Sequence, residues 1–236
     1  MAQPLMVYSD LATLDPKAHV VSPASPREIL SPGIVRNGFT SLQIAVDVPA
    51  NKPWEMDVAQ NPDNAVDVTL YRVTGDKLEM LSNPVVLGTG PAVFWMDMWA
   101  KKGAPAARIK VEPQLHVDDD WVIYPMEGRI TEATVPDAPA GGWPAGEAAP
   151  GDVLRGFACG KAPTQAPNSK EASAEASQET TVAALRYRNA QQDLALASKS
   201  GAKTEVEKRL GSCEAPLAAD NPERYLRVRD FLFGAQ

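Results

Sequence analysis

Apolar and polar residues alternate with a period of two along the first half of the chain, and this pattern constrains the fold more than any other feature. Successive side chains of a β-strand point to opposite faces of its sheet, so the pattern predicts strands that bury one face. In residues 40–48 the apolar set is Leu42, Ile44, Val46 and Val48, and the intervening set is Ser41, Gln43, Ala45 and Asp47. We expect Leu42, Ile44 and Val46 to lie in a core and Ser41, Gln43 and Asp47 to lie outside it.

Prolines fall between the alternating runs rather than within them. The chain positions are Pro23, Pro26, Pro32, Pro49, Pro53, Pro62, Pro84, Pro91 and Pro105. Proline cannot donate a ladder hydrogen bond, so these positions mark strand ends and turns. No long helical pattern separates the runs, which favours antiparallel pairing over βαβ units. The predicted fold is mainly β, an antiparallel β-sandwich of the immunoglobulin or jelly-roll kind.

The composition changes after residue 132, and we divide the chain there. Residues 1–132 are expected to form the β-sandwich, and residues 133–177, rich in Pro, Gly, Ala and Ser, a linker or a strap over its surface. Residues 178–236 are expected to be a smaller helical region. Its first helix should run from about Gln178 to Ser200–Gly201, with Val182, Leu185, Asn189 and Leu196 on one stripe. A short helix over 204–210 and a final one from Asp220 or Asn221 follow.

The charge of the chain bears on its partners and on its location. A net charge of −7 repels phosphate groups, so we expect neither nucleic acid nor an anionic membrane as a partner. No apolar run approaches the ~20 residues needed to span a bilayer. Residues 1–11 lack the features of a signal peptide, whereas Ala2, Gln3 and Pro4 are typical of a mature exported chain. This favours a secreted or periplasmic protein whose signal peptide has been removed, and a cytoplasmic protein is the alternative.

Two stretches resemble the N-terminal β-sandwich of secreted glycoside hydrolases of the family 123 type. Residues 35–46 resemble the strand that opens that domain, with Arg36, Asn37 and Gln43 at its characteristic positions. Residues 94–111 are similar to a later strand and turn of the same domain. The resemblance covers the first half of the chain and implies a β-sandwich in an exported, carbohydrate-related bacterial setting.

The same resemblance carries no active site. Gly38 stands where that family has an acidic residue, and Ala107 where it has glycine. The family holds its catalytic carboxylates in a following barrel of ~250 residues, which does not fit after Glu132. We therefore expect a protein that is not an enzyme.

The strand around Trp95 offers a candidate ligand surface. If Phe94, Met96, Met98 and Ala100 fill the core, then Trp95, Asp97 and Trp99 point the other way. Two indoles beside a carboxylate suit a carbohydrate, because aromatic faces stack on sugar rings while the carboxylate accepts hydroxyl hydrogens. The alternative is that residues 133–152 or the C-terminal helices cover this face and make both tryptophans part of the core.

Two further sets of residues suggest binding or bonding chemistry. Asp118, Asp119 and Asp120 form the densest group of oxygen ligands and could hold Ca²⁺, but the spacing, glycine and closing glutamate of an EF-hand are absent, which favours a solvated acidic hairpin turn. No other cofactor is expected. Cys159 and Cys213 are the only two cysteines. A disulfide between them fits an exported protein, and two separate buried thiols are the alternative.

Three functions from different classes remain open. The first is a non-catalytic binding or accessory protein that faces a glycan. The second is a structural subunit of an extracellular or cell-surface assembly, a homo-oligomer included, in which the helical tail binds a protein partner. The third is a hydrolase with scattered carboxylates, such as Asp97 with Glu127.

Overall fold

The computed structural model describes residues 3–21, 31–138, 181–201, 204–205 and 208. Eleven strands and one long helix make up this part of the chain. The strands are β1 (Leu5–Ser9), β2 (Gly33–Arg36), β3 (Gly38–Val46), β4 (Pro53–Asn61), β5 (Asp67–Thr74), β6 (Lys77–Met80), β7 (Val86–Thr89), β8 (Ala92–Ala100), β9 (Ala107–Val117), β10 (Asp120–Ile123) and β11 (Glu127–Thr134). The helix is α2 (Val182–Ser200). The prediction of a mainly β protein is confirmed.

All eleven strands belong to one sheet. Its main path is β1-β3-β8-β2-β11-β9-β4-β7, while β10 pairs with β9, β5 with β8, and β6 with β5. Most neighbours are antiparallel, but β2 runs parallel to both β11 and β8. The sheet is therefore mixed, and the prediction of antiparallel pairing throughout is wrong at β2.

The chain reverses direction between β2 and β3 at a single residue. Asn37 joins β2 to β3 with a φ of 54°, a left-handed conformation in which asparagine is enriched. Its N–H donates to the carbonyl oxygen of Ala100 at 2.7 Å, so the chain reverses around the end of β8. Arg36 then pairs with Ala100 on one edge of β8 and Gly38 on the other. Alternation predicts strands but not the direction in which they pair, so the sequence did not reveal this turn.

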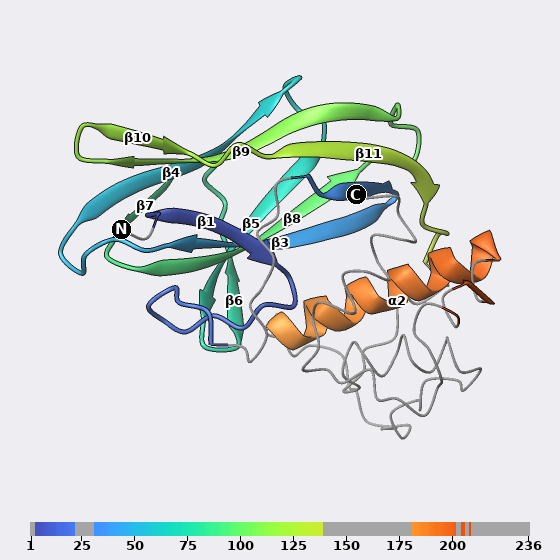
Figure 1. Cartoon of the computed structure of the whole chain (residues 1–236), viewed down its shortest axis with the longest axis horizontal. Helices are drawn as coiled ribbons and strands as arrows, with labels where there is room; N and C mark the ends of the chain where they lie inside the picture. Colours follow the sequence, from blue (N-terminus) through green and yellow to red (C-terminus); the bar gives the residue numbers. More distant parts are fainter. Residues whose placement is uncertain (1–2, 22–30, 139–180, 202–203, 206–207, 209–236) are drawn as a thin grey trace.

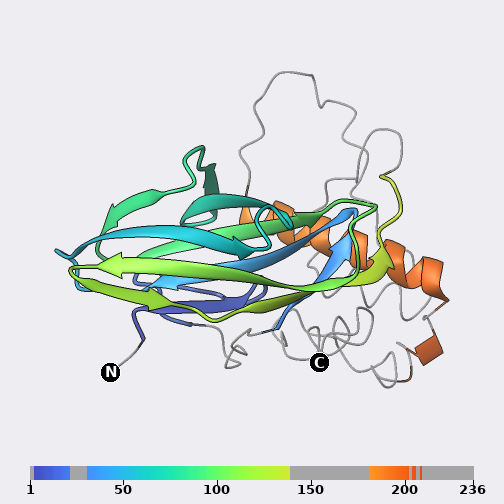
Figure 2. The ribbon, with the colours of Figure 1, turned by 90° about the horizontal axis from the view of Figure 1, so that it is seen from above.

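One large hydrophobic core joins the two halves of the sheet. One half contributes residues of β3 and β8, and the other contributes residues of β4, β9 and β11. In Figure 1, β9, β10 and β11 run along the upper side of the molecule and β3 and α2 lie below them; Figure 2 gives the view from above. Leu42, Ile44 and Val46 are all buried in this core, as predicted. Their burial fixes which face of β3 points inward.

The opposite face of β3 is also covered, which corrects the sequence prediction. Ser41 is 0% exposed and Gln43 3%, whereas only Asp47 is half-buried. The Gln43 side-chain amide donates to the carbonyl oxygens of Ser9 and Ala12 at 3.0 and 2.6 Å. The Asn189 side chain of α2 donates to Ser41 Oγ at 2.9 Å. Polar residues are buried here because each one finds a hydrogen-bond partner.

Helix α2 ends where the sequence predicts. Gly201 adopts φ 68° and ψ 13°, and its N–H donates to the carbonyl oxygen of Ala197, which is a left-handed helix cap. The helix begins at Val182, because the Thr181 side chain accepts from the N–H of Ala184 at 3.1 Å. Thr181 is extended and forms a β-bridge with Lys77, so the predicted start of the helix at about Gln178 is too early.

Much of the C-terminal prediction falls outside the described residues. Residues 204, 205 and 208 are helical, which agrees with the short helix expected over 204–210. The final helix lies beyond the described part, as does most of 133–177, so the domain boundaries stay predictions. Where the structure describes the chain, no helix has the length and apolar character required to cross a membrane.

Candidate functional site

The two faces of β8 carry different kinds of side chain. Phe94, Met96, Met98 and Ala100 are buried in the main core, as the alternation predicts. Trp95 and Asp97 lie on the other face, where they are 0% and 1% exposed, and Trp99 is half-buried. The surface predicted for a ligand is therefore covered at Trp95 and Asp97. Helix α2 covers it, which is the alternative that the sequence left open.

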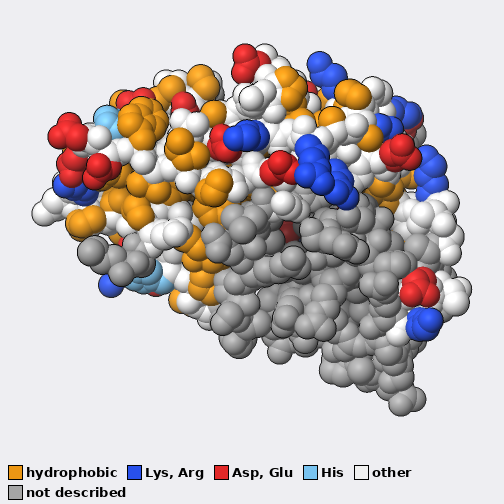
Figure 3. Space-filling model, turned by 45° about the horizontal axis from the view of Figure 1, so that its top comes forward, with side chains coloured by type: hydrophobic (Ala, Val, Ile, Leu, Met, Phe, Trp, Pro, Cys, Tyr) orange, Lys and Arg blue, Asp and Glu red, His pale blue; other side chains and the backbone are white. Residues whose placement is uncertain are grey.

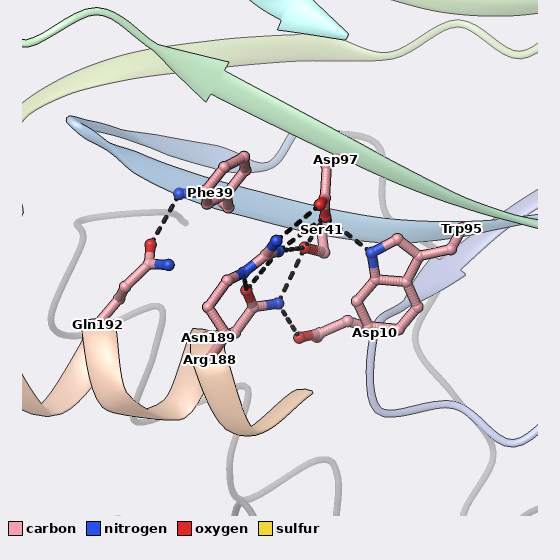
Figure 4. A network of polar contacts seen from close by, with 8 residues as sticks. All are labelled: Asp10, Phe39, Ser41, Trp95, Asp97, Arg188, Asn189 and Gln192. Carbon is pink, nitrogen blue, oxygen red and sulfur yellow. Dashed lines mark hydrogen bonds and ion pairs between the residues drawn. The ribbon is translucent and has the colours of Figure 1, made fainter. Parts of the chain in front are cut away.

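The Asp97 carboxylate lies at the centre of a network of polar contacts between the sheet and α2 (Figure 4). Its Oδ1 accepts from Ser41 Oγ at 2.5 Å, from Trp95 Nε1 at 2.7 Å and from Arg188 Nη2 at 3.0 Å. Its Oδ2 lies 2.9 Å from Arg188 Nη1, which completes a two-pronged ion pair. A buried carboxylate needs such partners, because desolvating an unpaired charge costs several kcal/mol.

Arg188 is held in place from several sides. Its guanidinium carbon lies 3.9 Å from the centre of the Phe39 ring, a cation–π arrangement. Its Nη2 also donates to Asn189 Oδ1 at 3.0 Å. The Asn189 amide in turn donates to Asp10 Oδ2 at 3.1 Å and to Ser41 Oγ. One turn of α2 thus joins three parts of the chain that are far apart in sequence.

Two more side chains of α2 bind backbone groups. Arg186 donates to the carbonyl oxygens of Asp10 and Ala12, both at 2.6 Å. Burial lowers the pKa of the Arg186 guanidinium, and the nearby Asp10 carboxylate opposes this shift. Gln192 Oε1 accepts from the N–H of Phe39 at 2.7 Å. Hydrogen bonds make up much of the interface between α2 and the sheet. Because hydrogen bonds are directional, they fix the orientation of α2 on the sheet.

Sequence reasoning missed the arginines of this network. Their positions in the sequence do not indicate burial, yet Arg186 and Arg188 are both half-buried. The one sign of a polar interface was Asn189, a polar residue on the apolar stripe of the helix.

The other predicted sites lie at an exposed turn or outside the described residues. Asp118, Asp119 and Asp120 are at the exposed β9–β10 turn, where Asp118 has a φ of 56° and forms an ion pair with Lys52. Among the described residues, no three His, Cys, Asp or Glu side chains are grouped to hold a metal ion. Cys159 and Cys213 lie outside those residues, so their disulfide stays a prediction.

The two carboxylates of the hydrolase hypothesis have separate partners. Asp97 is buried beneath α2, where Arg188 neutralises it. Glu127 lies on β11, with its side chain half-exposed, and pairs with Arg108 at 3.3 Å. Each carboxylate is thus paired with its own arginine, and the two do not face a common space.

A different surface carries exposed aromatic and acidic side chains. We name it the β9 outer face and define it as Glu55, Asp57, Gln114, His116, Trp121 and Ile123. Register places Glu55 beside His116 and His116 beside Trp121, and it places Asp57 beside Gln114 and Gln114 beside Ile123. The intervening residues Met56 and Leu115 are fully buried, so the outer-face set points away from the core.

Trp121 is the most prominent side chain of the β9 outer face. It is 56% exposed, and its ring is stacked on His116 with the centroids 4.8 Å apart and the planes 20° from parallel. Stacking on a neighbouring ring limits the rotation of the indole. Figure 3 shows hydrophobic side chains beside a histidine and a group of acidic side chains at one end of the molecule.

Asp57 is an unusual member of this face. Its Oδ1 atom is buried and has no hydrogen-bond partner in the part of the chain that the structure describes. Burial raises the pKa of the Asp57 carboxyl, and the nearby Glu55 carboxylate raises it further. The charged form of Asp57 is therefore disfavoured in the folded protein.

Replacing Asp57 by asparagine should stabilise the protein at neutral pH. Because its pKa is raised in the folded state, the ionised Asp57 carboxylate lowers the free energy of unfolding. This destabilisation is full above the pKa of the folded state and disappears below the ordinary pKa of 3.8. The variant should melt at a higher temperature than the parent near pH 7, and this gain should shrink as the pH falls to about 4. Thermal unfolding at both pH values measures it. Asp119→Asn, at an exposed carboxylate, is the control, and an equal gain there would contradict the assignment.

Comparison with known proteins gives only distant similarities. No protein-family model and no curated protein matches the chain. Among solved structures, a family 123 glycoside hydrolase from Clostridium perfringens that hydrolyses glycolipid glycans matches with 8% identity and a TM-score of 0.39. The match covers 56% of this chain and 28% of that one. A Bacteroides ovatus GH5 xyloglucanase bound to a XXXG heptasaccharide matches with 12% identity and a TM-score of 0.27, over 46% of this chain and 20% of that chain. The chain thus spans less than a third of either protein.

Proposed function

We propose that this chain is a non-catalytic binding or accessory protein that holds a neutral polysaccharide on the β9 outer face. In this proposal the two halves of the sheet act as the layers of a β-sandwich. Their shared core, built from β3 and β8 on one side and β4 and β9 on the other, supports that description. The resemblance of residues 35–46 and 94–111 to an exported domain supports a location outside the cytoplasm.

The observation that carries the proposal is the exposed Trp121 ring stacked on His116. A fixed indole offers a flat apolar surface that can pack against the apolar face of a sugar ring. Glu55, Asp57 and Gln114 lie on the same side of the sheet and can bond to sugar hydroxyls. Two carboxylates on the face repel anionic glycans, so a neutral chain is the expected ligand.

The surface proposed here replaces the one expected from the sequence. Trp95 and Asp97 are covered, and their polar atoms are used within the chain, so they do not offer a ligand surface while α2 is in place. Helix α2 also has a partner within its own chain. The contacts of Arg186, Arg188 and Asn189 join α2 to the sheet of its own chain, which supports a binding protein rather than a structural subunit as the proposal.

Trp121→Ala should weaken polysaccharide binding by about tenfold or more, because it removes the stacking surface. A panel of neutral polysaccharides, including xyloglucan, cellulose-type and chitin-type oligomers, can be screened with the intact chain by calorimetry. Met80→Ala is the matched control, because Met80 is 66% exposed but lies on β6, away from the β9 outer face.

Two results would overturn the proposal. One is that no member of the panel binds to the folded parent protein. The other is that Trp121→Ala and Met80→Ala retain equal affinity for a polysaccharide that does bind.

A further inference from the structure

A cavity of about 420 Å³ opens between β4, β5 and the segment that follows β6. Its lining residues are Val58, Gln60, Asn64, Val66, Asp67, Val68, Leu70, Leu81, Ser82, Asn83 and Pro84. Val66 and Leu70 belong to the main core, and Val58, Val68 and Leu81 pack against it. The apolar residues of the cavity thus belong to the main core or pack against it, whereas Asn64, Asp67, Ser82 and Asn83 are exposed, so the cavity is open to solvent. Its volume falls in the range of small-molecule sites.

The orientation of two amide groups in this wall is fixed by the backbone. Gln60 Oε1 accepts from the N–H of Val66 at 3.1 Å, and Asn83 Oδ1 accepts from the N–H of Val85 at 3.1 Å. Since only the oxygen of an amide can accept, the amino group of each side chain keeps its two hydrogens for other partners. Two side chains that line the cavity therefore have amino groups left to donate to other partners.

Acceptors and donors are both present in the cavity. Asp67, Ser82 and Asn64 also line the cavity, and their side chains end in a carboxylate, a hydroxyl and an amide. The described residues that line the cavity include no lysine or arginine. A carboxylate without a cation in the same wall repels anions. A wall with both donors and acceptors suits hydroxyl groups, because a hydroxyl can both donate and accept a hydrogen bond.

We propose that this cavity binds a small neutral polyhydroxylated molecule of about monosaccharide size. Hydroxyl groups of the ligand accept from Gln60 and Asn83 and donate to Asp67, and the apolar side of its ring packs against Val68 and Leu81. The cavity residues are distinct from those of the β9 outer face, so this inference does not depend on polysaccharide binding there.

The test uses the intact chain and a panel of D-glucose, D-galactose, D-mannose and N-acetyl-D-glucosamine. We expect at least one sugar to bind and to shift the backbone amide signals of residues 66–70 and 81–85 in ¹⁵N-resolved NMR spectra. Asp67→Asn keeps the shape of the side chain but removes the charge, and Val68→Phe fills the space. Each should weaken binding by about tenfold or more.

Two control variants show whether a sugar that binds occupies this cavity. Asp63→Asn changes an exposed carboxylate of the neighbouring loop that does not line the cavity, and it should leave the affinity unchanged. Leu87→Ala, at an exposed residue of β7 that does not line the cavity, should also leave it unchanged, and amide shifts in residues 66–70 and 81–85 rather than 114–123 distinguish this cavity from the β9 outer face. The proposal is wrong if no sugar of the panel binds, if the shifted amides lie elsewhere, or if a folded Val68→Phe variant binds as tightly as the parent.

Discussion

Replacing Arg188 by alanine should lower the free energy of unfolding by about 3–5 kcal/mol, because it removes one partner of a buried ion pair. Asp97 is 1% exposed and would lose the guanidinium that pairs with it. The remaining donors, Ser41 and Trp95, are neutral and cannot replace a cation. Urea unfolding followed by circular dichroism measures the loss.

Two further variants sharpen this test. Lys199→Ala removes an exposed cation from the last turn of the same helix, and we expect a change within about 0.5 kcal/mol. The double variant Arg188→Ala with Asp97→Asn should cost less than the sum of the two single changes, because the unpaired charge is gone. Simple additivity, or a loss below about 1 kcal/mol for Arg188→Ala, would show that the ion pair does not hold α2 on the sheet.

Leu42→Ala and Ser41→Ala should both destabilise the protein, although the two side chains point to opposite faces of β3. Leu42→Ala leaves a cavity in the main core and should cost about 2–5 kcal/mol. Ser41→Ala removes a hydroxyl that donates to Asp97 and accepts from Asn189, and it should cost about 1–3 kcal/mol. Chemical denaturation of each variant gives both values.

Thr89→Ala, at the exposed end of β7, is the comparison for Ser41→Ala and should change the stability by no more than about 0.5 kcal/mol. If Ser41→Ala were equally mild, the second face of β3 would not be closed by α2 in solution. The strand would then bury one face only, as its alternating sequence suggests.

The sequence predicts the strands well, because burial of one face leaves a period of two in the chain. Leu42, Ile44 and Val46 and the core set of β8 lie where the alternation places them. The end of α2 at Gly201 can also be predicted from the local sequence, since a left-handed cap needs glycine at one position. The parallel pairing of β2 depends on Asn37 and on strands that come much later in the chain, and no local pattern records it.

The second covered face shows where local reasoning fails. Ser41, Gln43 and Asp97 have the composition of a solvated surface, and periodicity alone assigns them to solvent. They are buried because Arg188 and Asn189, from a helix far along the chain, supply hydrogen bonds to Ser41 and Asp97, while backbone carbonyls accept from Gln43. The sequence therefore identified Trp95 and Asp97 as a distinctive pair but not what covers them.

The parallel placement of β2 also determines when the chain can fold. β2 lies between β8 and β11 in the sheet, so its neighbours end only at Ala100 and Thr134. During synthesis, the first strands leave the ribosome long before the partners of β2 exist. The backbone groups of β2 cannot form their hydrogen bonds in the sheet until β8 and β11 have been synthesised, so closure of the sheet has to follow translation of β11. Local pairs such as β5–β6 and β9–β10 can form earlier, but the centre of the sheet closes only when β11 is present.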